Sequence, residues 1–143
     1  ANYLKRKIDQ ASLDEYMGAL KQIVRELNGN WSLVVQASDG KVLAACDRIR
    51  TFPLFYYYSD KVFLLSSSID SILENRKMTI SNNSAAEYLL AGYVTGKETL
   101  FPQVNQVQSG ELLELDSTKS EWDMTLSRYH RFTPSCTESD FCA

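Results

Sequence analysis

The first part of the chain carries apolar residues at helical spacing. Between positions 13 and 27 they recur three and four residues apart, as the buried stripe of an amphipathic helix requires. Ser12 stands where a helix N-cap is expected, and Asn28-Gly29 is a typical stop signal. The pattern predicts one helix over residues 13–27.

From Trp31 onward the spacing becomes that of β-strands. Two runs rich in β-branched and aromatic residues, 31–37 and 41–46, flank an Asp-Gly turn that suits a tight hairpin. Two further runs, 53–58 and 61–66, follow in the same arrangement. We expect these four strands to form one antiparallel meander.

Helical signals return after the fourth strand. A short helix is expected over residues 69–75. Ser84 and Glu87 then have the spacing of a capping box, which predicts a second helix that runs through Tyr93.

The last third of the chain is less regular. Residues 95–110 show little periodicity, so we expect an irregular crossing there, followed by strands over 111–116 and 128–132. Residues 1–132 are expected to form the domain, and residues 133–143 a flexible tail. Helices and antiparallel strands within a single domain indicate an α+β class with stacked layers.

Composition mainly excludes classes of function. A chain of 143 residues is long enough for one domain, and 44% apolar residues with a net charge of -3 are typical of a soluble globular protein. It has neither a basic nucleic-acid footprint nor an uninterrupted apolar run of about 18 residues. We therefore expect a cytoplasmic protein without nucleic-acid or membrane partners.

The cysteine and histidine content argues against a metal site. The chain has three cysteines, Cys46, Cys136 and Cys142, one histidine, His130, and no CxxC pattern. We expect reduced thiols with Cys46 buried at a strand end, and a Cys136–Cys142 disulfide is the alternative. His130 has no accompanying nucleophile, so a surface or hydrogen-bonded side chain is expected.

The stretch CDRIRTFPLFYYYSD, residues 46–60, places several charges before a proline and an aromatic strand. It is one of an ordered set of short motifs: Gly29-Asn30-Trp31-Ser32-Leu33-Val34-Val35, Asp47-Arg48 with Pro53-Leu54-Phe55-Tyr56, Leu65-Ser66-Ser67-Ser68-Ile69, Glu87-Tyr88-Leu89 with Gly92-Tyr93-Val94, Thr99-Leu100-Phe101, and Gln108-Ser109-Gly110-Glu111. Together they resemble the second half of the class II glutamine amidotransferase domain of asparagine synthetases. The resemblance implies an N-terminal-nucleophile hydrolase fold, two stacked antiparallel sheets between helices, truncated at its N-terminal half.

The resemblance gives the charged stretch a structural interpretation. In this family an Asp-Arg pair ends one strand, and a short turn leads into the next. It therefore implies structural roles for Asp47, Arg48, Pro53 and Tyr56, with a bidentate Asp–Arg hydrogen bond holding the turn. The family usually has glycine where this chain has Arg50. If that glycine provides a positive φ or a close approach, the turn here must be remodelled.

Glutamine hydrolysis in this family uses an amino-terminal cysteine whose own α-amine is the general base. This chain begins with Ala1, and none of its cysteines is terminal. Asn28-Gly29 resembles the family's oxyanion-hole pair, but a helix stop explains it. Asp14 and Glu15 are candidates for the family's acidic residue that binds the substrate amine, but they suit the first turn of a helix. We therefore expect no catalytic residue in this chain and no glutaminase activity.

Three functions are compatible with the sequence. The first is an amidotransferase-like domain of an asparagine synthetase-related protein, which supports an ATP-dependent, amide-forming synthetase domain or subunit. The second is the vestigial N-terminal domain of a protein similar to β-lactam synthetases or lasso-peptide cyclases. The third is an unrelated stand-alone protein-binding module. The first two predict a large apolar patch where a partner domain or the missing half would cover the sheet, and the third predicts a closed monomer.

The expected partners follow from the first two functions. No cofactor is expected in this chain, since ATP and magnesium would belong to a synthetase domain, whose Ser-Gly-Gly-x-Asp-Ser motif does not occur here. Thr99, Leu100 and Phe101 are the expected interdomain loop. Sheet edges left by missing strands would favour a homo-oligomer. A fragment of a longer protein and a degenerate free-standing domain both remain open.

Overall fold

The structure is a computed structural model that describes residues 13–37, 40–59, 62–74 and 76–133. Within these ranges the elements, in chain order, are α2 (Leu13–Glu26), β1 (Ser32–Gln36), β2 (Lys41–Cys46), β3 (Phe55–Ser59), β4 (Val62–Ser66), α3 (Ile69–Leu73), α4 (Asn82–Ala91), β5 (Val104–Gln106), β6 (Glu111–Asp116) and β7 (Asp123–Arg128).

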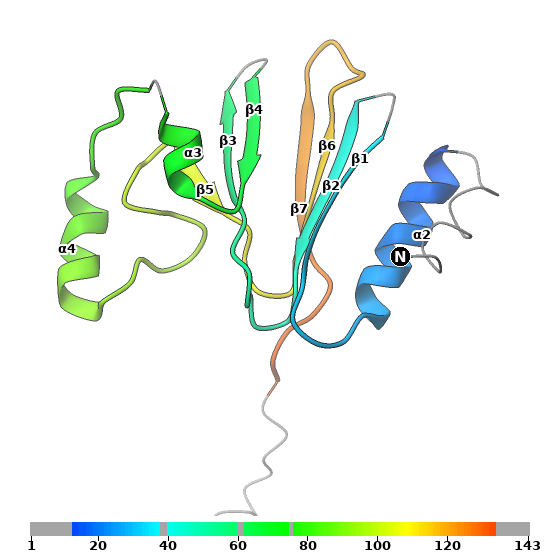
Figure 1. Ribbon diagram of the computed structural model, residues 1–143, viewed down its shortest axis with the longest axis horizontal. Coiled ribbons are helices and arrows are strands. Elements are labelled where there is room, and N and C mark those ends of the chain that lie inside the picture. The colour runs from blue at the N-terminus through cyan, green and yellow to red at the C-terminus, as the bar shows by residue number, and fades with distance from the viewer. Residues whose placement is uncertain (1–12, 38–39, 60–61, 75, 134–143) are drawn as a thin grey trace, which may run out of the picture.

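The elements form layers (Figure 1). The described strands build a four-stranded sheet, in the order β1-β2-β6-β7, and a three-stranded sheet, in the order β4-β3-β5, and every strand pair is antiparallel. Helix α2 covers the outer side of the larger sheet, while α3 and α4 lie on the outer side of the smaller one. This arrangement confirms the α+β class. The N-terminal-nucleophile type of fold stays a prediction.

The predicted four-stranded meander is wrong. The two hairpins, β1–β2 and β3–β4, do form, but they belong to different sheets. Strand β2 pairs with β6, and β3 pairs with β5. Alternation along a strand predicts which side chains share a face, but it does not identify the lateral neighbour of that strand. The segment between β2 and β3 therefore carries the chain from one sheet to the other.

Two apolar clusters hold the layers together. One fills the space between the sheets and consists of Val42, Ala44, Cys46, Leu54, Tyr56, Val107, Leu113 and Leu115. The other lies between α2 and the larger sheet and consists of Leu20, Val24, Leu43, Ala45 and Leu112. Strand β2 contributes to both because its alternate side chains point to opposite faces. The burial of Cys46 at the end of this strand confirms the prediction for that residue.

The last part of the chain corrects two predictions. The expected irregular crossing contains a strand, β5, which pairs with β3. The expected strand over 128–132 is displaced, since β7 covers Asp123–Arg128 and pairs with β6. Its side chains alternate between exposed and half-buried, and its polar residues gave it the appearance of a loop. The tail predicted over 133–143, with its Cys136–Cys142 alternative, lies outside the described residues except for Thr133.

The amino end of α4 also differs from its prediction. Ser81 is the N-cap, and its Oγ accepts a hydrogen bond from the amide of Ser84 at 3.3 Å. The Glu87 carboxylate instead accepts a hydrogen bond from the amide of Thr95 at 3.1 Å. The predicted capping box of Ser84 and Glu87 is therefore wrong by one turn. The helix ends at Ala91, and its C-cap Gly92 has a φ of +81°.

Candidate functional site

The turn after β2 is built around a buried carboxylate. Asp47 is 1% exposed. Its Oδ1 accepts a hydrogen bond from the amide of Ile49 at 2.8 Å, and its Oδ2 accepts one from the amide of Trp31 at 3.0 Å. The amide of Thr51 completes the set at 3.1 Å from Oδ2. We call residues 47–51 the Asp47 turn; its carboxylate ties the start of β1 to the end of β2.

The predicted hydrogen bond between Asp47 and Arg48 is not formed. Arg48 is exposed, and in the described part of the chain the carboxylate is bound by backbone amides and by the side chain of Thr51. Burial disfavours the ionised carboxyl, but the hydrogen bonds from Ile49, Trp31 and Thr51 outweigh it and lower the pKa of Asp47. Amides of the turn itself are close enough to make an arginine partner unnecessary.

The backbone of the same turn reaches the start of β6. The Asp47 carbonyl accepts hydrogen bonds from the amide of Gly110, at 3.0 Å, and from that of Arg50, at 3.1 Å. Gly110 has a φ of +62°, and a Cβ there would lie 2.6 Å from the carbonyl oxygen of His130. This position therefore requires glycine for both its backbone conformation and its close approach.

Arg50 occupies a conformation that favours glycine. Its φ is +55°, and it is the one residue other than glycine with a positive φ among those described. The sequence left open whether a positive φ is used here and predicted a remodelled turn if it is; Arg50 itself adopts the positive φ. In this chain the left-handed conformation persists with an arginine, which costs about 1–2 kcal/mol relative to glycine.

The side of the Asp47 turn forms a groove with the loop after α4. Ile49 and Arg50 of the turn and Tyr93 after α4 line this groove of about 290 Å³. The loop is held in place because the Gly96 carbonyl accepts a hydrogen bond from the side-chain amide of Gln106 at 3.0 Å. No ion pair of Arg50 is formed within the described ranges. The groove therefore presents a cation between fixed walls.

The remaining residues near the turn are buried in the core. Tyr56 is 1% exposed, and burial, with a smaller contribution from Glu111, raises its pKa to about 12. Pro53 is half-buried just before β3. Burial also raises the pKa of the Cys46 thiol to about 11, and its Sγ donates a hydrogen bond to the carbonyl of Phe52 at 3.5 Å. A neutral, enclosed thiol of this kind is a poor nucleophile.

The predicted interdomain loop has well-defined internal contacts. Thr99 is buried, and its hydroxyl donates a hydrogen bond to the carbonyl of Val104 at 2.8 Å and accepts one from the amide of Phe101 at 3.1 Å. The Leu100 carbonyl accepts a hydrogen bond from the amide of Ser81 at 2.9 Å. Residues 99–101 therefore connect the N-cap of α4 to β5. Their interdomain role stays a prediction.

A comparison with known families matches this framework. A model of the glutamine amidotransferase domain matches residues 10–130, which include both sheets and the Asp47 turn. The chain belongs to the glutamine amidotransferase domain family. This confirms the resemblance that the short sequence motifs indicated.

One relative of this amidotransferase domain is a protein of Methanocaldococcus jannaschii, named as a glutamine-hydrolyzing asparagine synthetase. The two are 24% identical over 103 residues, which is 68% of this chain and 20% of the relative. The chain therefore spans about a fifth of the length of the curated relative that it matches.

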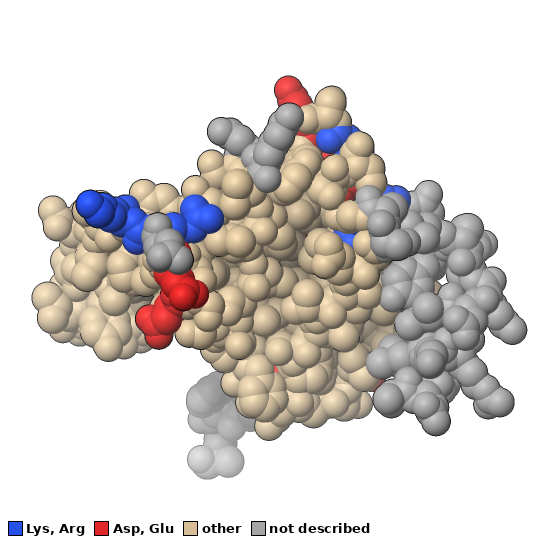
Figure 2. Space-filling view, turned by 45° about the horizontal axis from the view of Figure 1, so that its top comes forward, with Lys and Arg blue, Asp and Glu red and all other residues tan. Residues whose placement is uncertain are grey.

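The amidotransferase domain exposes a set of large apolar side chains on α4 and just after it. Leu89 is 83% exposed, Leu90 is 89% exposed and Tyr93 is 60% exposed, with Tyr88 beside them. We call these four residues the α4 face. In Figure 2 the lobe at the left, on the side where α4 lies, carries Lys and Arg along its upper part and uncharged surface below them. Large apolar side chains exposed close together in the chain are candidates for a site where proteins associate.

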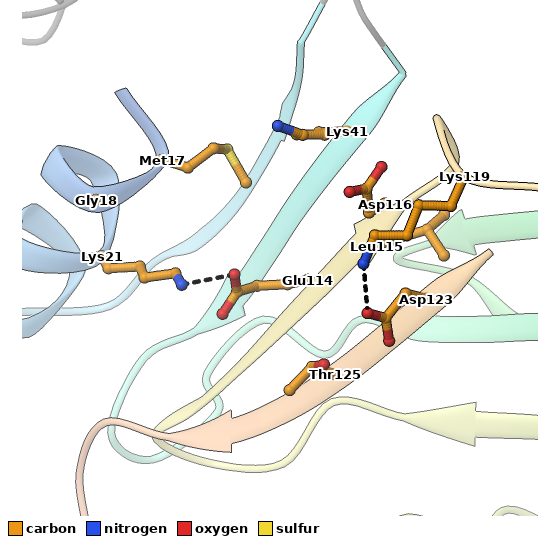
Figure 3. Close-up of a pocket in the computed structure, with 10 residues that line it drawn as sticks. All are labelled: Met17, Gly18, Lys21, Lys41, Glu114, Leu115, Asp116, Lys119, Asp123 and Thr125. Atoms are coloured by element: carbon orange, nitrogen blue, oxygen red, sulfur yellow. Dashed lines mark hydrogen bonds and ion pairs between the residues drawn. The ribbon is translucent and has the colours of Figure 1, made fainter. Parts of the chain in front are cut away.

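A second cavity of the amidotransferase domain lies between α2 and the larger sheet and is lined mainly by charged groups (Figure 3). Its volume is about 330 Å³. Lys21 pairs with Glu114 at 2.7 Å, and Lys119 pairs with Asp123 at 2.9 Å. Because these charges neutralise one another, the cavity offers a ligand no uncompensated charge from these four residues.

Neither a metal site nor a membrane-spanning helix is found in the described part of the chain. No group of three or more histidine, cysteine or acidic side chains there could hold a metal ion. No helix there has the length and apolar character needed to cross a membrane. The cytoplasmic location stays a prediction.

The sequence interpretation missed the α4 face. Leu89 and Leu90 stand in a helical pattern and are of a residue type that is usually buried. The available signal was their adjacency, because two consecutive leucines cannot both point to the same narrow stripe of a helix. The helix also lacks a charged face opposite them, which removes the usual contrast between inner and outer sides.

Proposed function

We propose that this amidotransferase domain supports an ATP-dependent, amide-forming synthetase domain and does not itself hydrolyse glutamine. The synthetase domain would belong to the same polypeptide or to a partner subunit. Family membership and the similarity to a protein named as an asparagine synthetase support the class of reaction. ATP and magnesium would be bound by the synthetase domain.

The α4 face is the observation that carries the proposal. Full burial of an exposed leucine contributes about 1.5–3 kcal/mol, so covering Leu89 and Leu90 would stabilise an association substantially. A synthetase domain is the proposed occupant because the relative is about five times longer than the part matched by this chain. Tyr93 belongs both to this face and to the Arg50 groove, so an acidic side chain of the partner could pair with the guanidinium next to the apolar contact.

The absence of glutaminase activity is supported by the state of Cys46. It is the free cysteine in the described part of the chain, it is fully buried, and its pKa of about 11 keeps the thiol protonated at neutral pH. A thiolate is the form that attacks an amide. Cys46 should therefore not act as the nucleophile, and we expect the 143-residue chain to release no ammonia from glutamine above the background rate.

The first experiment is the intact mass of the native protein in its source cells, detected with an antibody against this chain. The proposal predicts either a polypeptide several times heavier than 16.2 kDa that contains a synthetase domain, or a stable complex with such a subunit. An isolated species at 16.2 kDa would contradict it. Glutamine-dependent ammonia release that disappears in Cys46→Ser would contradict the inactive assignment.

The α4 face is tested in the polypeptide or complex that the mass measurement identifies. Leu89→Lys with Leu90→Lys should separate the two domains or subunits, measured as protease sensitivity of their junction or as loss of the complex. Asn83→Lys lies on the same helix, is also exposed, and serves as the matched control. Equal behaviour of the two variants would exclude the α4 face as the contact.

A further inference from the structure

The described sheets end in four edge strands: β1 and β7 in the larger sheet, and β4 and β5 in the smaller one. An edge strand presents a row of unpaired backbone N–H and C=O groups to which another strand can add. Proteins normally block such pairing by keeping edge strands short or by placing charges or prolines on them. The four edges of this domain differ in this respect.

Two of the edges are protected. Strand β7 has Asp123 and Arg128 at its ends, and Lys119 pairs with Asp123 at 2.9 Å. Strand β5 has only three residues. Both features discourage a further strand from pairing there.

The other two edges carry neither form of protection within their own described residues. Strand β1 (Ser32–Gln36) and strand β4 (Val62–Ser66) each have five residues, and neither contains a charged residue or a proline. Val34 in β1 is 50% exposed and Val62 in β4 is 42% exposed. Uncharged strands of this length with exposed β-branched residues are suited to pairing with another strand.

The two unprotected edges border the same cleft. Val34 and Gln36 of β1 lie on one side of this cleft of about 610 Å³, and Phe63 and Leu65 of β4 lie on the other. Val42 contributes to the lining between them. A partner that adds to β1 can therefore reach β4 as well, and it would close the open side of the inter-sheet core.

We propose that this partner is a second copy of the chain, which adds its β1 antiparallel to β1 and its β4 to β4 about one two-fold axis. The sequence of β1 suits pairing with itself: around a central Val34, Leu33 would face Val35 of the other copy, and Ser32 would face Gln36. Across this β1 pair, apolar residues would meet apolar ones, and polar residues would meet polar ones. The two halves of the cleft would then join into one continuous core.

Both layers are needed for this interface. Stable specific interfaces bury at least about 1,200 Å² in total, and one five-residue strand pair is small against that area. Since β1 and β4 lie on opposite walls of one cleft, a single two-fold axis through it can pair both edges. The inference is independent of the α4 face and goes beyond the proposed function.

The experiment is sedimentation equilibrium of the 143-residue chain over a range of concentrations. A monomer–dimer equilibrium is expected, and Val34→Lys should raise its dissociation constant at least tenfold, because a buried lysine would face its own copy on the axis. Gln36→Lys is a second, independent disruption on the same wall. Thr125→Lys places the same charge on the protected edge β7 and should leave the equilibrium unchanged. Far-UV circular dichroism establishes that each variant is folded.

The outcomes separate clearly. Weakening by both β1 variants, without an effect of Thr125→Lys, supports pairing through β1. A strict monomer at every concentration overturns the proposal, and a partner that covers the cleft would then have to be a different polypeptide. A dimer that persists in both β1 variants, or one that Thr125→Lys disrupts equally, also overturns it. Loss of the dimer only in Leu89→Lys with Leu90→Lys would assign self-association to the α4 face and overturn pairing through β1.

Discussion

The Asp47 turn and the α4 face reverse the usual distribution of polar and apolar residues. In the turn a carboxylate is 1% exposed and accepts several amide hydrogen bonds, whereas on α4 two neighbouring leucines are more than four-fifths exposed. The Asp47 carboxylate therefore has a structural task, and the apolar helix is the surface that we propose for contact with a partner. In this domain the exposure of apolar groups identifies a candidate site better than the presence of charge does.

The largest effect that would test this contrast is expected from Asp47→Ala. It should reduce the free energy of unfolding by about 3 kcal/mol, because the amides of Trp31, Ile49 and Thr51 would lose their acceptor inside the structure. Urea denaturation provides the measurement. Arg48→Ala, at the exposed neighbour, is the control and should change stability by less than about 0.5 kcal/mol. Similar values for both variants would contradict the structural task of the carboxylate.

The same carboxylate makes stability depend on pH. Because the pKa of Asp47 is lower in the folded state than in the unfolded chain, its contribution is complete above the unfolded value of about 3.9. It is lost progressively as the pH falls below that value towards the folded pKa. Comparison of the unmodified chain with Asp47→Asn by urea denaturation, from neutral pH to about pH 3, should show the difference between them shrinking in acid. A constant difference would exclude this linkage.

Gly110→Ala should destabilise by about 2 kcal/mol, because the residue has a φ of +62° and the new Cβ would lie 2.6 Å from the His130 carbonyl oxygen. Gly18→Ala is the matched control. Gly18 lies inside α2 with no atom within 4 Å of the added Cβ, so its replacement should stabilise the helix by up to about 1 kcal/mol. Opposite signs in thermal unfolding are the expected result, and equal signs would contradict the close approach of Gly110 to His130.

These residues also show how far the sequence alone could lead. Spacing predicted α2, the two hairpins and the bounds of β2, because those signals are local. It failed for the pairing of β2 with β6, which joins residues about 70 positions apart, and for the short strand β5, which is too brief to show a period. The residues of the Asp47 turn were identified, but their partners were not, since backbone amides carry no sequence signal.

Arg50→Gly should stabilise the domain by about 1 kcal/mol, because glycine adopts a φ of +55° without the steric cost that arginine bears, although its greater freedom in the unfolded chain offsets part of the gain. Arg50→Ala keeps the strain, removes the guanidinium and is the control. If the guanidinium contacts a partner, both variants should weaken that association equally while differing in stability. Thermal unfolding and the complex identified from source cells provide the two readouts. A destabilised Arg50→Gly would show that the arginine is required by the turn.

The smallest change in stability is expected on the α4 face. Leu89→Lys with Leu90→Lys should alter the free energy of unfolding of the isolated domain by less than about 0.5 kcal/mol, since both side chains are already surrounded by solvent. Urea denaturation of this variant beside Asn83→Lys provides the measurement. A loss above about 2 kcal/mol would mean that the leucines are buried within the isolated domain, and the α4 face would then be core. A near-zero change in stability, together with loss of the synthetase contact, would show that the two leucines are needed for the association and not for folding. Asp47→Ala should show the opposite: a large loss in the free energy of unfolding. Any loss of the synthetase contact in this variant would follow from the loss of folded protein.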